Sequence, residues 1–421
     1  MPSLKISVLS RRLTRSAVLA LVLLSVVMQP QQPSQSPKSR PVQAESDKYL
    51  FRPADPLNAQ AFEHFYNMDY ERSIQEFNQV LQRHPDNSDA INHLLNAVLF
   101  HELYRIGALN AGEYANDSFL NSSHRPADPH TCEQIKSLVQ KALTIEEKKL
   151  TANSKDVAAI YARGVTRAQF ATYTALIEHA WFSALRNAVG ARHDHERVLE
   201  LDPHNLDAKL IVGAHNYVVG SLPWGVKTAS SMVGLGGSKE KGLEYLHETA
   251  AGKSETSIDA KIVLVVFLRR ERRFDEALQI LRSLEPQYQH NVLFAVEDGN
   301  LLRAKGQNEQ AEAIYRHVWQ DGRNGKYAGL SYEIAAVALG DLMRGQKNYT
   351  AAAAAYEQVG ELPKPDPEAS QRAALGAGEM YDLIHKRELA IKKYQAVIAV
   401  DSGSHFAETA RKRIKDPYSG S

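Results

Sequence analysis

Three segments in the C-terminal third of the chain repeat one spacing of small and aromatic residues. In each segment a glycine is followed by an alanine after 12 residues, a tyrosine after 4 more and a valine after a further 3. The sets are Gly299, Ala311, Tyr315 and Val318; Gly340, Ala352, Tyr356 and Val359; and Gly378, Ala390, Tyr394 and Val397. Steps of four and three residues follow one face of an α-helix, and we expect small residues twelve apart to let two antiparallel helices approach closely. The spacing therefore predicts a series of helical hairpins.

Looser copies of the same spacing occur earlier in the chain. One copy comprises Ala61, Ser73, Phe77 and Val80, and another comprises Val265, Ala277, Leu281 and Leu284. Pro85 is expected to end the second helix of the first copy, and Gly213 takes the small position in a helix that starts near Ala208. A repeat near 34 residues with this pattern resembles the tetratricopeptide repeat (TPR) family. The resemblance implies an all-α fold, a right-handed superhelical solenoid of helix-turn-helix repeats with an irregular, expanded middle region.

The N-terminus has the arrangement of a secretory signal. Basic residues precede an apolar run over 17–28, and a stretch rich in Pro, Gln and Ser follows. Val42-Gln43-Ala44 fits the small-residue cleavage pattern but lies 16 residues beyond the apolar run, so either cleavage occurs earlier or the segment stays as an anchor. We expect an exported protein, periplasmic or otherwise extracytoplasmic, or one anchored by this segment. Membrane contact is expected only through the N-terminal segment, if it is uncleaved.

Composition and spacing together predict six consecutive segments. They are a signal peptide or anchor (1–28), a linker (29–52), an N-terminal TPR with a following helix (53–104), an irregular TPR-like middle (105–255), a C-terminal TPR array (256–403), and a capping helix with a tail (404–421). The middle is expected to hold a long polar loop, a helix over 133–149 and one continuous helix over 156–188.

A glycine-rich crossover, YVVGSLPWGVKTASSMVGLGGSKEKGLEYL, spans residues 217–246. This stretch resembles the tetratricopeptide repeat 39 family and its fungal inclusion-body-clearance relatives, with Trp224 where a second proline stands in that family. The chain is also similar to exported bacterial TPR proteins. The first resemblance implies a membrane-tethered, lipid-handling adaptor as one alternative function.

Charge and motif content bear on three further classes of function: nucleic-acid binding, metal binding and catalysis. The chain has 50 basic and 49 acidic residues, a formal charge of +1, which argues against nucleic acid as a partner. The single cysteine, Cys132, excludes an intramolecular disulfide and a cysteine-based metal cluster. We find no catalytic motif and expect no cofactor. His193 and His195 diverge on a helix, and His93 and His101 lack a third converging ligand, so we expect no metal. An enzyme, metal-dependent or not, sited in 105–240 remains an alternative.

The residue four positions after the small residue is Arg269, Arg303 and Arg344 in successive units. Because equivalent positions stack along the groove of a TPR array, these arginines would form a ladder suited to a carboxylate-bearing or phosphorylated peptide. Helix-end arginines are also favoured by the helix dipole alone. The neighbouring candidates for partner binding are Asn300, Asp341, Glu379 and Asp382. The sequence thus predicts a non-catalytic scaffold or adaptor that binds a protein or peptide partner in its concave groove.

Overall fold

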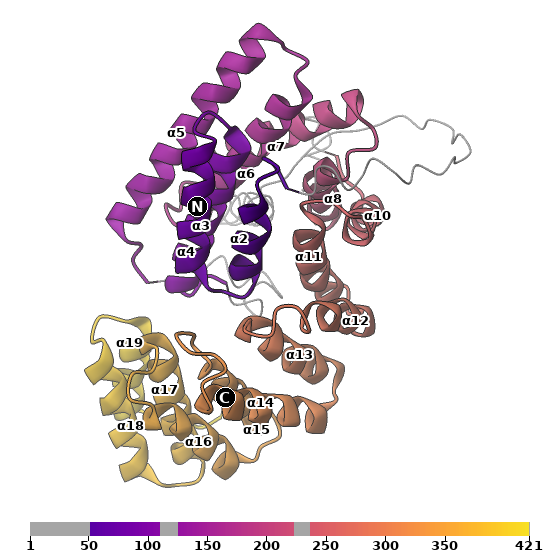
Figure 1. The fold of residues 1–421 in the computed structure, drawn as a ribbon. Coiled ribbons are helices and arrows are strands. Elements are labelled where there is room, and N and C mark those ends of the chain that lie inside the picture. The colour runs from indigo at the N-terminus through magenta and orange to yellow at the C-terminus, as the bar shows by residue number, and fades with distance from the viewer. Residues whose placement is uncertain (1–50, 110–124, 223–235, 421) are drawn as a thin grey trace, which may run out of the picture. The chain divides into compact units, whose positions relative to one another are not determined.

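The computed structural model describes residues 51–109, 125–222 and 236–420, and these residues form helices, turns and no strand. The predicted signal segment, nearly all of the linker, and parts of the polar loop and of the 217–246 crossover lie outside them. The chain divides into two compact units, residues 1–271 and 272–421. Both are all-α and consist of successive helical hairpins of the TPR type (Figure 1).

The described residues of the first unit form four helical hairpins and one further helix. Its helices are α2 (Pro56–Tyr66), α3 (Tyr70–Arg83), α4 (Ser88–Arg105), α5 (Pro129–Ala152), α6 (Val157–Leu176), α7 (Trp181–Leu201), α8 (Leu206–Gly220), α10 (Lys239–Ala251) and α11 (Ser257–Arg270). The second helix of each hairpin packs on the first, and each hairpin packs on the next. Pro85 follows the end of α3, as the sequence predicts.

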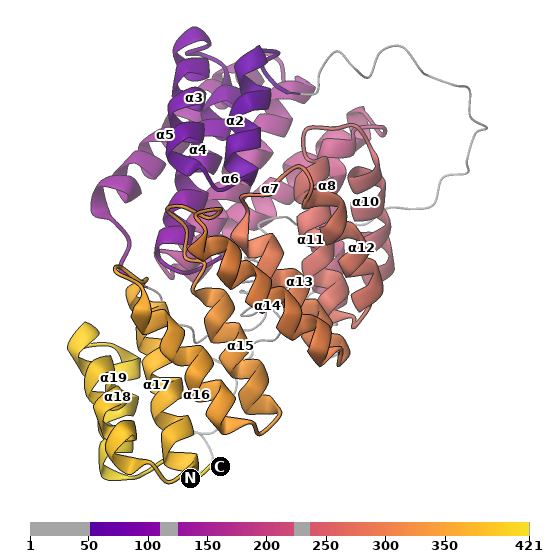
Figure 2. The same ribbon diagram turned by 60° about the horizontal axis from the view of Figure 1, so that its bottom comes forward.

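The second unit begins with α12 (Phe274–Leu284) and continues with three hairpins and a terminal helix. These are α13 (Val292–Lys305), α14 (Asn308–Arg323), α15 (Ile334–Gly345), α16 (Tyr349–Glu357) with its 3₁₀ extension (Gln358–Glu361), α17 (Pro367–Leu383), α18 (Arg387–Val400) and α19 (His405–Lys415). The first helices α13, α15 and α17 pack one on the next, and α19 packs on α17 and α18 (Figure 2). Helix α19 lies within 404–421, the segment expected to hold a capping helix and a tail.

One turn geometry recurs after the first helix of five hairpins. A residue one or two positions beyond the end of that helix has a positive φ, and the next amide donates to the carbonyl five residues earlier. The left-handed residues are Met68, Gly107, Gly306, Lys347 and His385. This is the Schellman arrangement, which satisfies carbonyls at a helix end and turns the chain back. Among these five, Gly107 and Gly306 adopt the conformation without the steric cost of a side chain.

The repeated glycine accommodates the tyrosine ring of the second helix. A Cβ on Gly340 would lie 2.4 Å from Cε1 of Tyr356, and Gly299 and Gly378 face Tyr315 and Tyr394 in the same way. The expectation that two small residues meet across the hairpin therefore needs correction for these three repeats, since the ring is the nearest neighbour.

In the α8–α10 hairpin two small residues do meet. A Cβ on Gly242 would lie 2.6 Å from the carbonyl oxygen of Gly213. The other predicted repeat positions are buried: Ala61, Ser73, Phe77, Ala277, Ala311, Ala352 and Ala390.

The prediction of one continuous helix over 156–188 is wrong. The segment forms α6 and α7, which are joined by residues 177–180, and His179 there has a φ of 52°. A left-handed residue breaks the i to i−4 hydrogen-bond ladder, so the chain reverses and α7 packs on α6. The middle region therefore keeps the hairpin architecture of the rest, with longer helices.

Candidate functional site

We define the first-helix face as the side of the second unit where polar side chains link α13, α15, α17 and α19. Six of the seven predicted partner-binding residues lie on these helices: Asn300, Arg303, Asp341, Arg344, Glu379 and Asp382. The seventh, Arg269, lies near the end of α11 in the first unit. The structure thus places two of the three predicted ladder arginines in one unit.

Charged side chains on this face pair between successive helices. Arg303 on α13 donates to the backbone carbonyl oxygen of Asp341 on α15, at 3.1 Å. The Asp341 carboxylate accepts from Arg372 on α17 at 2.7 Å. Arg344 on α15 lies 3.0 Å from the Glu379 carboxylate on α17. The paired arrangement means that Arg344 already has a carboxylate partner within the protein.

The repeat tyrosines, which lie on the second helices, orient the side-chain hydrogen-bond acceptors of this face. Tyr356 donates its hydroxyl to Asp341 Oδ1 at 2.6 Å, and Tyr394 donates to Asp382 Oδ2 at 2.8 Å. Tyr315 makes the same kind of bond to Asn300 Oδ1, at 2.8 Å. Burial, reinforced by the adjacent carboxylates, raises the pKa of Tyr356 and of Tyr394, so both remain protonated donors. The spacing that builds each hairpin therefore also orients a polar group on the face.

The cations of this face are more exposed than the anions. The side chains of Arg344 and Arg372 are 36% and 47% exposed, whereas those of Glu379 and Asp382 are 9% and 1% exposed. Burial raises the pKa of Glu379. Burial alone would lower the pKa of Arg344, but Glu379 and Tyr418 outweigh it and the net pKa is raised. The surface therefore offers guanidinium groups held in place by carboxylates that are less exposed than they are.

Four residues of this face were not identified from the sequence. They are Arg372, Arg387, Arg413 and Tyr418. Arg387 donates to both oxygens of Asp382 and to the carbonyl oxygens of Arg413 and Ile414. None of the four stands at the position that repeats as Arg269, Arg303 and Arg344, so the spacing that identified those arginines could not identify them.

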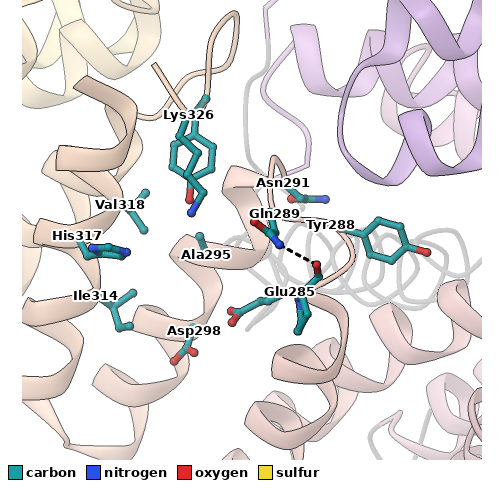
Figure 3. Close-up of a pocket in the computed structure, with 12 residues that line it drawn as sticks. Glu285, Tyr288, Gln289, Asn291, Ala295, Asp298, Ile314, His317, Val318 and Lys326 are labelled. Carbon is teal, nitrogen blue, oxygen red and sulfur yellow. Dashed lines mark hydrogen bonds between the residues drawn. The ribbon is translucent and has the colours of Figure 1, made fainter. Parts of the chain in front are cut away.

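A pocket of about 290 Å³ lies elsewhere in the second unit, between the α12–α13 turn, α13, α14 and residues 326–327 (Figure 3). Glu285 lines it beside Asp298, which Arg282 binds through two hydrogen bonds of 2.7 and 2.8 Å. Burial first, and then Asp298, raise the pKa of Glu285 to about 7. Asp298 and Asn300 are two residues apart on α13 and point about 200° apart. The pocket is therefore separate from the first-helix face.

The first unit contains a polar network that joins distant segments. Tyr66 on α2 donates to Asp259 on α11 at 3.0 Å, and His93 on α4 lies 2.7 Å from Glu255. Arg52 donates to Asp207 on α8 at 3.1 Å. Burial raises the pKa of Asp259 to about 7. These contacts connect the first helices of the unit to its last.

The region 105–240, in which an enzyme site is the alternative expectation, contains a buried group of basic residues. Arg192 is fully buried and pairs with Glu196 at 3.2 Å, and burial lowers its pKa to about 9. His195 packs against Gly164 and lies 2.8 Å from the carbonyl oxygen of Ala191.

Outside that region, the two α4 histidines of the sequence analysis have different partners. His93 contacts Glu255, and His101 stacks on Tyr70.

Within the described ranges, no group of three His, Cys, Asp or Glu residues is arranged to hold a metal ion. The helices of those ranges include none with the length and apolarity needed to span a membrane.

No protein-family model matches the chain. No curated protein matches it either. Among solved structures it is similar to Pseudomonas aeruginosa pilF, with 14% identity over 60% of this chain and 97% of the other, at a TM-score of 0.35. It is also similar to human IFIT1 in a dimer with PPP-AAAA (15% identity; 88% and 82% covered; TM-score 0.39) and to yeast Tom70 (13%; 88% and 96%; 0.33). These likenesses assign no function to this chain.

Proposed function

We propose that this protein is an exported, non-catalytic helical-repeat scaffold that binds a polypeptide partner on its first-helix face. The observation that carries the proposal is the row of paired polar groups across the first helices α13, α15 and α17 and the terminal helix α19. Partly exposed arginines there pair with less exposed carboxylates, those of Asp341, Glu379 and Asp382. An extended peptide carries a carbonyl and an amide at every residue, which such a row of donors and acceptors can bind along its length.

The orientation of these groups supports recognition. Arg344 and Arg372 are each held by a carboxylate of a neighbouring helix. Asp341 and Asp382 are in turn held by tyrosine hydroxyls of the second helices. Groups fixed in this way lose little side-chain entropy on binding, which favours affinity. Among the described residues, the face thus has the character of a preorganised binding surface.

Site-specific photocrosslinking tests the binding proposal. A photoreactive residue replaces Arg372 on the first-helix face in one variant and Arg316 on α14 in a matched control. Their side chains are 47% and 55% exposed. We expect a discrete crosslinked polypeptide from position 372 and none from position 316. Mass spectrometry then identifies the polypeptide, and purified components confirm the binding. Equal labelling from both positions, or none from 372, would contradict the proposal.

Export is tested separately by fractionation of the source cells. The apolar run over 17–28 and the basic residues before it support export. We expect the full chain in the extracytoplasmic or membrane fraction, and a chain that lacks residues 1–28 in the cytoplasm. Recovery of both chains in the cytoplasm would refute export and leave the binding proposal standing.

A further inference from the structure

The last residues of the chain return to the first-helix face. After α19 ends at Lys415, residues 416–420 have no regular structure, and Asp416 has extended backbone angles. The amide of Tyr418 donates to Asp382 Oδ2 at 2.9 Å, and its hydroxyl accepts from Arg344 at 2.7 Å. The guanidinium carbon of Arg413 lies 4.6 Å from the centre of the Tyr418 ring, and that of Arg344 lies 5.2 Å from it.

These contacts recognise each part of one tyrosine residue. Asp382 binds the amide, Arg344 binds the hydroxyl, and the two guanidinium groups bind the π system of the ring. A cation near an aromatic face is attracted by the negative charge density of the ring, and more strongly where water is excluded. Tyr418 is half-buried, whereas its neighbours at 416, 417, 419 and 420 are exposed. The tail is therefore held mainly through a single residue.

The contacting groups are positioned by residues outside the tail. Asp382 accepts from Arg387 and from the hydroxyl of Tyr394, neither of which belongs to residues 416–420. Glu379 lies 3.0 Å from Arg344 and 3.4 Å from Arg413, so one buried carboxylate holds both arginines. The site is thus built by α15, α17, α18 and α19, and the tyrosine is its occupant.

We propose that Arg344, Asp382 and Arg413 form a receptor for a tyrosine in an extended, otherwise polar peptide segment. The C-terminal tail is its resident ligand, and a partner polypeptide that presents such a tyrosine takes its place. This inference rests on the proposed function, because it specifies the chemistry of the partner. It also makes the tail a competitor: a tethered ligand has an effective concentration in the millimolar range for short flexible linkers.

Peptide binding to the purified full-length chain tests the receptor. The probe is a fluorescently labelled peptide with the sequence of residues 415–421, and its binding is followed by anisotropy. We expect Tyr418→Ala, which vacates the site, to bind the probe at least about 10-fold more tightly than the wild type does, because the tail no longer competes. A probe with alanine in place of its tyrosine should not bind. A probe with phenylalanine should bind a few-fold more weakly.

Second-site variants locate the binding. Tyr418→Ala combined with Arg413→Ala should lose the probe, whereas Tyr418→Ala combined with Arg316→Ala should retain it. Absence of binding to Tyr418→Ala up to about 1 mM probe, or equal binding of the tyrosine and alanine probes, would overturn the inference. The comparison of probes needs no further change in the protein, so misfolding cannot explain it. If position 372 crosslinks a partner but the probe does not bind, this inference fails and the proposed function stands. Probe binding without a crosslinked partner would instead count against the proposed function.

Discussion

At the scale of single residues, the tyrosine ring that packs over the first small position of the repeat leaves room only for glycine there. A Cβ on Gly340 would lie 2.4 Å from the Tyr356 ring, whereas one on Gly345 in the same helix would meet nothing within 4 Å. We expect Gly340→Ala to lower the free energy of unfolding by about 1–3 kcal/mol, because the ring must move in a packed core. Gly345→Ala should be neutral or stabilising, because alanine has the higher helix propensity. Urea unfolding followed by circular dichroism measures both, and equal effects would refute the account.

Buried carboxylates give a second prediction at this scale. Glu146 is fully buried in the first unit and accepts from Thr166 at 2.8 Å, and burial raises its pKa from 4.5 to about 7. A raised native-state pKa means that the native state binds the proton more tightly than the unfolded state does. The stabilising contribution of the protonated Glu146 carboxyl is therefore present below pH 4.5 and is lost as the pH rises through about 7.

We expect Glu146→Gln to be less stable than the wild type, or equal to it, at pH 5 and more stable at pH 8. The difference should change by up to about 3 kcal/mol, since each pKa unit corresponds to about 1.4 kcal/mol. Glu147→Gln, at the next and exposed position, is the matched control and should show no such change. Urea unfolding at the two pH values measures it. A pH-independent difference for Glu146→Gln would show that the carboxyl does not titrate in this range.

At the scale of helices, the turn between α13 and α14 gives a third prediction. Gly306 has a φ of 88°, while Met68, Lys347 and His385 take similar values with a side chain. Gly306→Ala should cost about 1–2 kcal/mol, the penalty of a left-handed residue with a Cβ. Unfolding experiments compare it with Gly345→Ala, which adds the same methyl group at a helical φ. If the two variants are equally stable, the turn conformation does not matter to stability.

The helices themselves could largely be predicted from the sequence, because periodicity and caps are local. Helix α19 lies within 404–421, where a capping helix and a tail are expected, and Pro85 follows α3. The break between α6 and α7 could not be predicted, because His179 adopts its left-handed conformation without glycine or proline nearby. Spacing located Arg344, Glu379 and Asp382 on one face. It could not reveal Arg413 or Tyr418, whose contacts depend on where the chain goes after its last repeat.

At the scale of each whole unit, the first unit departs from the simplest solenoid, in which a repeat contacts only its neighbours. Tyr66 and Asp259 are 193 residues apart, and Arg52 and Asp207 are 155 apart, yet each pair is hydrogen-bonded. No periodic pattern marks these residues, so their contacts across the unit could not be predicted from the sequence. The consequence is that residues just before α2 contribute to the stability of α8 and α11.

Removal of those residues gives the last prediction. Arg52 donates its amide to Glu255 at 2.9 Å and its guanidinium to Asp207, and its Cζ lies 4.6 Å from the Tyr161 ring centre. A chain that starts at residue 45, just after the predicted cleavage pattern, keeps these contacts, and one that starts at 54 loses them. We expect the shorter chain to be less stable by roughly 2 kcal/mol, because Asp207 loses its cationic partner and Glu255 loses an amide donor.

Hydrogen exchange measured by mass spectrometry locates the effect. Exchange should quicken in α2, α8 and α11 of the chain that starts at 54 and stay unchanged in α15 to α18, which belong to the other unit. Arg52→Ala in the chain that starts at 45 should reproduce most of the change, since the guanidinium makes two of the three contacts. Unchanged exchange in α8 and α11 would show that the ends of the unit are held without Arg52, and cleavage of the leader beyond residue 52 would then be tolerated.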